Sequence, residues 1–149
     1  RLSLVGSEMC IRDRNTGQTK LQYLLRSMEP ELSDRTYVFC TVPDERRDQL
    51  ERRAVLLFRE REGLTAVLPK TDAERTGIDY AFPSRMITLT VHSSLDAVGL
   101  LAAVTQALAQ VEISVNLVSA FYHDHLFVPE HRAVEALQIL SALSEQATQ

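Results

Sequence analysis

Apolar residues recur along the chain in two periods, which predicts a protein built from both helices and strands. Helical spacing appears first at Leu21, Leu24, Leu25 and Met28, and Pro30 ends that segment. Further helices are expected over residues 44–53, 70–77, 93–112 and 131–143, the first of these only one or two turns long. Strands are expected over residues 36–43, 54–60, 63–69, 86–92, 113–121 and 124–130.

The strand at residues 86–92 alternates cleanly and leads into a helix. Its aliphatic residues are expected to face the helices, and Thr88 and Thr90 to face solvent or a partner sheet. Ser93 followed by Asp96 approximates a capping box, which places the start of the next helix near Ser93. The apolar stripe of that helix would be Val98, Leu101, Thr105, Leu108 and Val111. Residues 78–85, which include Pro83, are interpreted as a connector.

The two halves of the chain resemble each other. YVFCTVPDERRDQL (37–50) echoes ITLTVHSSLDAVGL (87–100), and GLTAVLPKTDAERTGI (63–78) echoes DHLFVPEHRAVEAL (124–137). In each half a strand ends at a proline that opens a helix. The order strand, helix, strand, strand, helix is a ferredoxin-like pattern written twice. We therefore predict an α+β fold of two such halves, residues 15–83 and 84–149, with antiparallel sheets and helices on one face.

Composition narrows the class of protein. The 149 residues are 45% hydrophobic, which is enough for one compact domain or two small ones that share a core. The net charge of −4 and the mixed signs of the charges argue against a nucleic-acid binder, which needs a basic face. No apolar run approaches the roughly 20 residues of a membrane span. Cys10 and Cys40 lie far apart without metal or redox spacing, so we expect a reduced, cytoplasmic setting.

The first residues differ from the rest of the chain. RLSLVGSEMCIRDR, residues 1–14, resembles a translated sequencing-adapter read-through, and we exclude it from fold reasoning. A signal peptide fits poorly, because the apolar part is too short and charged residues stand where a small-residue cleavage site belongs. We expect the natural sequence to begin near Asn15.

The stretch VGLLAAVTQALAQVEISVNLV, residues 98–118, resembles the core of an ACT domain. In that family a strand and a loop lead into a Gly-Leu-Leu-Ala helix start, and a second strand carries a Ser-x-Asn-Leu pattern. Gly99 to Ala102 and Asn116 with Leu117 stand at those places. YVFCTVP, EGLTAVLP and RMITLTVHSSLDAVGL extend the likeness over residues 21–143, to small bacterial proteins with two ACT-like halves that are related to the regulatory domains of aspartokinase.

The resemblance implies a non-catalytic regulatory protein that binds a small ligand, often an amino acid, at an interface between ACT units and without a cofactor. The usual site is the loop between the first strand and the first helix. Backbone N–H groups at a helix start lack intrahelical partners and can hold a carboxylate, and Asp96 can pair with an ammonium group. The candidate ligand-binding residues are His92, Ser93, Ser94, Asp96, Gly99, Asn116, His123 and His125.

Two departures from the family pattern matter. The usual Asp-x-Pro-Gly approach to the helix is replaced by residues 93–99, so the helix is expected to begin a turn earlier and the carboxylate pocket to differ. A complete ACT unit also has a fourth strand, and this sequence stops soon after its last helix. Either the other half supplies that strand, or the sheet edge pairs with a second subunit. Because an open edge is an aggregation liability, we expect sheet pairing between the halves and a homodimer.

YHDHLFVP (122–129) also suggests a metal site as a lesser alternative. The end of the strand at 86–92 should lie beside the start of the strand at 124–130, so His92, His123 and His125 can converge there. Residues i and i+2 of a strand lie about 6.5–7 Å apart on one face, and three imidazoles suit zinc. The alternation does not fix the face of His123 and His125, because Leu126 and Phe127 are both apolar.

An enzyme is not expected. Ser93 and Ser94 are explained by N-capping, and Cys40 lies mid-strand as a small apolar residue would. No phosphate loop or paired-carboxylate pattern is present in the sequence. The remaining alternative is a dimerisation or protein-interaction module that binds no ligand.

Overall fold

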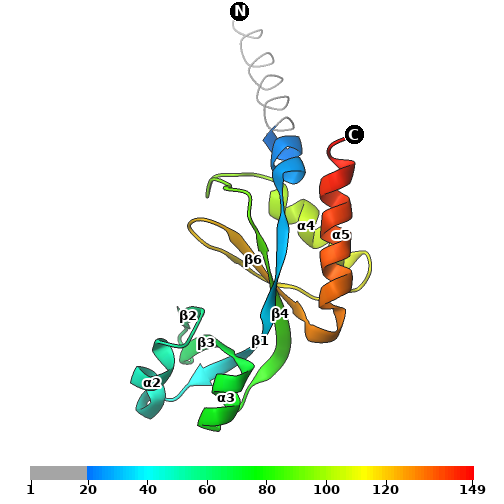
Figure 1. Ribbon diagram of the computed structural model, residues 1–149. Coiled ribbons are helices and arrows are strands. Elements are labelled where there is room, and N and C mark those ends of the chain that lie inside the picture. Colours follow the sequence, from blue (N-terminus) through cyan, green and yellow to red (C-terminus); the bar gives the residue numbers. More distant parts are fainter. Residues whose placement is uncertain (1–19) are drawn as a thin grey trace, which may run out of the picture.

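Residues 20–27 form the helix expected from the spacing of their leucines, and Pro30 ends the segment by starting a strand. The computed structural model describes residues 20–149 (Figure 1). The segment interpreted as a sequencing artefact, residues 1–14, therefore lies outside the described residues.

The strands and helices alternate as two βαββα units in sequence. The strands are β1 (Pro30–Val42), β2 (Leu56–Arg59), β3 (Leu64–Pro69), β4 (Ala81–Leu89), β5 (Asn116–Ser119) and β6 (Asp124–Pro129). The helices are α2 (Arg47–Glu51), α3 (Lys70–Thr76), α4 (Leu100–Ala109) and α5 (Ala133–Gln146), with 3-10 turns η1 (Asp44–Arg46) and η2 (Glu130–Arg132). None of the helices in residues 20–149 is long and apolar enough to cross a membrane.

All strands join one six-stranded antiparallel sheet in the order β2-β3-β1-β4-β6-β5. The second part of β1 pairs with β3, whereas its beginning pairs with β4, where Pro30 lies opposite Leu89. The start of β1 is thus the fourth strand of the C-terminal half. The start of β4 does the same for the N-terminal half, where Ala81 lies opposite Phe39. This confirms that each half receives its missing strand from the other.

The helices of the C-terminal half cover one face of its strands and make the larger core. The helix of residues 20–27 lies beside α4 and α5 over this face (Figure 1). Leu25 and Met28 are buried with residues of β4, β6, α4 and α5. Ile87 and Leu89 point into this core, which confirms the face predicted for the aliphatic residues of that strand. A smaller core in the N-terminal half contains Val38, Cys40, Val42, Leu50, Leu64, Ala66, Leu68 and Ala73.

The opposite face of the sheet has its own apolar cluster near the centre. Phe127 lies edge-on to Tyr37 at 5.9 Å and to Phe39 at 5.6 Å between ring centroids. Edge-to-face pairs at this separation are favourable. Since Tyr37 and Phe127 come from different halves, the cluster joins the halves on the face that none of the helices in residues 20–149 covers.

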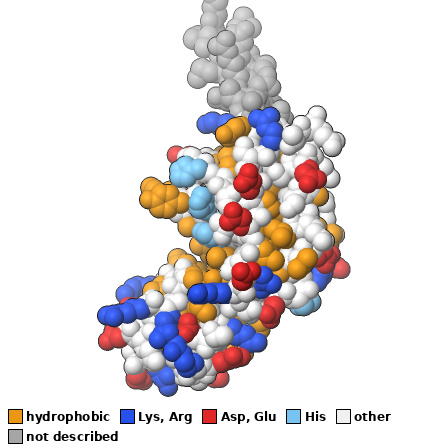
Figure 2. Space-filling view, in the orientation of Figure 1, with side chains coloured by type: hydrophobic (Ala, Val, Ile, Leu, Met, Phe, Trp, Pro, Cys, Tyr) orange, Lys and Arg blue, Asp and Glu red, His pale blue; other side chains and the backbone are white. Residues whose placement is uncertain are grey.

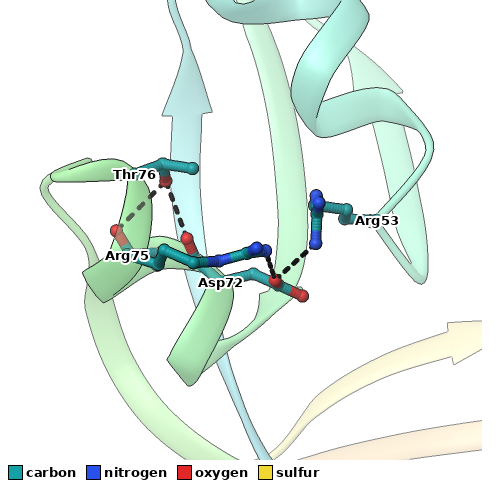
Figure 3. Close-up of polar contacts among 5 residues, drawn as sticks. Arg53, Asp72, Arg75 and Thr76 are labelled. Atoms are coloured by element: carbon teal, nitrogen blue, oxygen red, sulfur yellow. Dashed lines mark hydrogen bonds and ion pairs between the residues drawn. The ribbon is translucent and has the colours of Figure 1, made fainter.

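Polar contacts fix the helices of the N-terminal half (Figure 3). Asp72 accepts hydrogen bonds from Arg53, at 2.9 Å, and from Arg75, while Thr76 donates back to the carbonyl of Asp72 at 2.8 Å. Because the arginines are partly exposed, each ion pair contributes at most about 1 kcal/mol. Gly77 then closes α3 with φ of 65°, as its position in the sequence predicted.

Three predictions of local structure are wrong or only partly correct. Residues 81–85 are not a connector, since β4 runs through Pro83. The missing N–H of proline is tolerated there because the pairing of β1 with β4 is irregular between Tyr37 and Phe39. The capping box at Ser93 does not form either: α4 begins at Leu100, capped by Gly99. Its buried stripe is Leu100, Val104 and Leu108, so the predicted stripe was correct only at Leu108.

The internal repeat is present, but its register differs in the first strand. Tyr37 lies opposite Pro69, and Ser84 lies opposite Pro129. Tyr37 therefore corresponds to Ser84, not to Ile87 as the sequence comparison suggested. The third strands match as predicted, with Leu64 to Pro69 corresponding to Asp124 to Pro129.

Candidate functional site

The candidate residues gather where the loop after β4 meets the hairpin between β5 and β6. We call this place the histidine end and define it as residues 90–99 and 120–123. In Figure 2 histidine side chains gather on one face beside a protruding apolar group, whereas charged side chains of both signs cover much of the N-terminal half. The structure thus brings His92 to the hairpin that carries His123, as the neighbouring first and third strands predicted.

Aromatic rings connect the two segments. The His92 ring lies 6.3 Å from that of His123 and 6.2 Å from that of Tyr122. Tyr122 in turn lies 5.1 Å from Phe121, with the two rings inclined at 77°. Sequence reasoning missed Phe121 and Tyr122. The signal was available, because a hairpin tip is a solvated place where two adjacent aromatic residues have no core to fill.

A hydrogen bond ties the loop to the start of β6. The Ser93 hydroxyl donates to the carboxylate of Asp124 at 3.1 Å, and Asp124 is buried. Asp124 lies opposite Leu89 and therefore points to the helix-covered face. Sequence reasoning did not select Asp124, although period-two alternation places it on the same face as Leu126 and Val128. Ser93 thus holds the loop against the start of β6.

His125 points to the other face of the sheet. Its Nδ1 lies 2.9 Å from the hydroxyl oxygen of Thr88, its cross-strand neighbour. Burial lowers the pKa of His125, a positive charge on His123 lowers it further, and Asp124 raises it. This resolves the face that the sequence left open. The Nδ1 of His123 is buried without a hydrogen-bond partner.

Gly99 ends the loop and opens α4. Its φ of 97° is available to glycine at little cost, and a Cβ there would approach the Leu21 side chain to 3.2 Å. Before it, the Asp96 N–H donates to the Ser94 hydroxyl at 3.2 Å, which makes a local turn with both side chains exposed. Asn116 lies apart from these residues, at the opposite end of β5 from the hairpin tip.

Neither a metal nor a nucleophile is favoured by the geometry. Within residues 20–149, no group of three or more His, Cys, Asp and Glu side chains is arranged to hold a metal ion. Cys40 is buried, its thiol faces the carbonyl of Ala66 at 3.7 Å, and burial raises its pKa. A raised pKa disfavours the reactive thiolate.

The N-terminal half has an equivalent place with different chemistry. We call it the arginine end and define it as residues 43–47 and 59–63. A cavity of about 390 Å³ lies here, lined by residues that include Asp44, Arg47, Arg59 and Glu62. Arg47 donates to Asp44 at 2.9 Å. Pro43 alone separates β1 from η1, whereas ten residues, 90–99, separate β4 from α4.

Comparisons with known proteins agree with this architecture. Two family models described as ACT domain match the chain, one over residues 16–85 and the other over residues 81–142. No curated protein matches the sequence.

Among solved structures, a Vibrio cholerae protein of unknown function, described as a possible transport protein, is 44% identical, with a TM-score of 0.76 over 86% of this chain and 98% of that one. Aspartokinase alpha and beta subunits match at 12% identity and a TM-score of 0.62, over 78% of this chain and 97% of that one. The regulatory subunit of aspartate kinase from Thermus thermophilus matches at 11% identity and a TM-score of 0.59, over 76% and 95%. At these low identities the last two show a shared fold.

Proposed function

Because the chain belongs to the ACT domain family, whose members commonly bind small regulatory ligands, we propose that it binds a free amino acid at the histidine end without catalysing a reaction. The observation that carries this proposal is the ten-residue loop, which is held against the β5–β6 hairpin by Ser93 and by the ring of His92. Val91 ties the start of the loop to the larger core, and residues 92 and 94–98 are exposed to solvent.

Each group of a free amino acid has a complementary partner here. The first N–H groups of α4, which follow Gly99, have no intrahelical partners and suit a carboxylate. Asp96 is exposed in the same loop and suits the ammonium group. The imidazoles of His92 and His123 and the hydroxyl of Ser94 belong to the same two segments and can serve as further donors or acceptors. Ser93 acts through its bond to Asp124, and Gly99 through its backbone conformation.

Two of the eight candidates receive other roles in this proposal. His125 bonds Thr88 on the face of the sheet that no helix covers, and Asn116 stands at the far end of β5. We assign both to the sheet and not to direct ligand contact.

The proposal includes a homodimer. β2 and β5 form the two edges of the sheet and have unpaired backbone groups on their outer sides. Val55, Leu57 and Phe58 are exposed on and beside β2. A second copy that pairs with such an edge would complete the hydrogen bonding and cover apolar surface. Sedimentation equilibrium should give twice the monomer mass, and a monomer at high concentration would contradict this part.

A thermal-shift series with free amino acids tests the ligand proposal. A ligand that binds only the native state at a hundred times its Kd adds about 2.7 kcal/mol to stability, so one or a few amino acids should raise Tm by several degrees. Asp96→Asn should abolish the shift, and Asp48→Asn, an exposed aspartate on α2, should leave it unchanged. If no amino acid changes Tm, the chain is better explained as an interaction module without ligand.

A further inference from the structure

The histidine end exposes four large apolar side chains on its two segments. Phe121 and Tyr122 at the hairpin tip are 71% and 64% exposed, and Leu95 and Val98 in the loop are 64% and 85% exposed. Hydrophobic side chains this open to water contribute little to the folded core. Their presence on both segments of the site therefore needs another explanation than packing.

The N-terminal half shows that the hairpin itself does not require aromatic residues. Both hairpins close with the same backbone bond, from Glu60 N–H to the Gly63 carbonyl at 2.8 Å and from Ala120 N–H to the His123 carbonyl at 3.0 Å. The tip positions occupied by Phe121 and Tyr122 are filled by Arg61 and Glu62 in the other hairpin. A hairpin with a charged tip forms the same turn. The aromatic tip is therefore specific to the histidine end and is not required by the hairpin.

Charge restricts what the histidine end can hold. Residues 90–99 and 119–125 contain neither lysine nor arginine. An acidic ligand side chain would meet Asp96 and no permanent cation. A basic side chain would compete with the ligand ammonium for the same exposed carboxylate. The uncharged surface that remains is aromatic: Tyr122 lies between Phe121, at 5.1 Å, and His92, at 6.2 Å.

We propose that the amino acid bound at the histidine end carries an aromatic side chain, which packs against Tyr122 and Phe121 at the hairpin tip. This inference rests on the function proposed above and adds the class of ligand. The ligand ring adds to the ring contacts that start with the edge-to-face pair of Phe121 and Tyr122, and the backbone groups of the ligand lie toward Asp96 and the start of α4. Rigid aromatic side chains offer such contact area at small entropic cost.

Isothermal titration of the full chain with five amino acids tests the class. L-phenylalanine and L-tyrosine should bind at least ten times more tightly than L-leucine, and L-aspartate and L-lysine should bind weaker still. The double variant Phe121→Arg with Tyr122→Glu copies the tip of the other hairpin. It should keep its unfolding midpoint and lose at least tenfold in affinity for L-phenylalanine. Val134→Arg, at an exposed valine on α5, is the control and should bind as the unsubstituted chain does.

The outcomes separate this inference from the function on which it rests. If L-aspartate or L-lysine binds most tightly and Asp96→Asn abolishes that binding, amino-acid binding stands and the aromatic class is wrong. If none of the five binds, both proposals fail. If L-phenylalanine binds equally well to the double variant, the hairpin tip does not hold the ring. If the double variant changes only the sedimentation mass, the aromatic tip is a contact between copies of the chain, and the inference is overturned.

Discussion

The histidine end and the arginine end occupy equivalent places in the two halves, yet they share almost no chemistry. At the arginine end Arg47 pairs with Asp44 at 2.9 Å and approaches Glu51 at 3.8 Å. At the histidine end Phe121, Tyr122 and His92 are exposed to solvent, beside a partly buried Ser93–Asp124 bond. The fold therefore forms an equivalent site in each half, and the side chains determine which ligands each site can bind.

Loop length accounts for much of this difference. Pro43 turns β1 directly into η1, so the first helix of the N-terminal half is short and its start is tied to the strand. The loop 90–99 separates β4 from α4 and is anchored by the burial of Val91 in the larger core and by the bond of Ser93 to Asp124. An anchored loop can hold a ligand without disturbing the core on which it rests.

The largest expected effect tests whether the two ends belong to one cooperative unit. Met28→Ala opens a cavity in the larger core and Leu50→Ala opens one in the smaller, each at a cost of about 2–5 kcal/mol. Because β1 and β4 belong to both halves, either substitution should shift one common unfolding transition in urea, followed by circular dichroism. Val134→Ala, at an exposed valine on α5, should leave it in place. Two separate transitions would show that the ends are independent.

The glycines that flank helices in the two halves give the next effect. Gly99 and Gly77 both have positive φ, so alanine costs about 1–2 kcal/mol at either position. At Gly99 the added Cβ also meets Leu21 at 3.2 Å, whereas at Gly77 nothing lies within 4 Å. Gly99→Ala should therefore lower the urea midpoint more than Gly77→Ala does. It should also weaken the binding of the amino acid. Equal losses in stability would mean that the Leu21 side chain moves away from the added Cβ at no cost in free energy.

The Ser93–Asp124 bond gives a smaller effect. Ser93→Ala leaves a buried carboxylate without this donor, which should cost about 1 kcal/mol or somewhat more. Ligand affinity should fall as well, since the loop loses an anchor. In the protein without ligand, Ser94→Ala removes an exposed local turn and should change stability by no more than about 0.5 kcal/mol. Thermal melts of the two variants without ligand compare the two serines, and equal losses in stability would contradict the anchoring.

The smallest effect comes from the pH dependence of His125, which corresponds to the uncharged Thr65 of the other half. The folded state lowers the pKa of His125, so protonation favours the unfolded chain. Stability should therefore fall as the pH drops from about 6.5 through the lowered folded-state value, and it should be unaffected above that window. His125→Gln should flatten this slope in denaturation midpoints between pH 7 and 5. His131→Gln, at an exposed histidine, should not.

Local pattern was enough to predict most elements of the fold but not the way they pair. The alternation of Ile87 and Leu89, the closing Gly77 and the prolines that end β3 and β6 act within a few residues, and the structure confirms them. The exchange of fourth strands depends on partners distant in sequence. The polar start of β1 gave no strand signal, because it pairs with β4 at a place where alternation is weak.

The candidate site, like the fold, could be predicted only in part from the sequence. That His92 meets His123 follows from the antiparallel pairing of first and third strands. The face of His125 did not follow, because the apolar run after it hides the alternation that Asp124 begins. The start of α4 was missed because a backbone conformation at Gly99, and not a serine side chain, sets it. The proximity of His92 and His123 could be predicted from the sequence, whereas the face of His125 and the start of α4 could not.

The exchange of strands also governs how the chain is completed during synthesis. Ser144 on α5 donates to the carbonyls of Arg26 and Met28, and the second of these bonds spans 116 residues. At about 5–20 residues per second, the ribosome delivers α5 roughly 6–23 s after Met28. For about the first half of that interval the start of β1 has no strand to pair with, because its partner β4 ends at Leu89. Its polar residues, among them Glu31, Ser33 and Asp34, keep the unpaired segment hydrated and disfavour its association with other nascent chains.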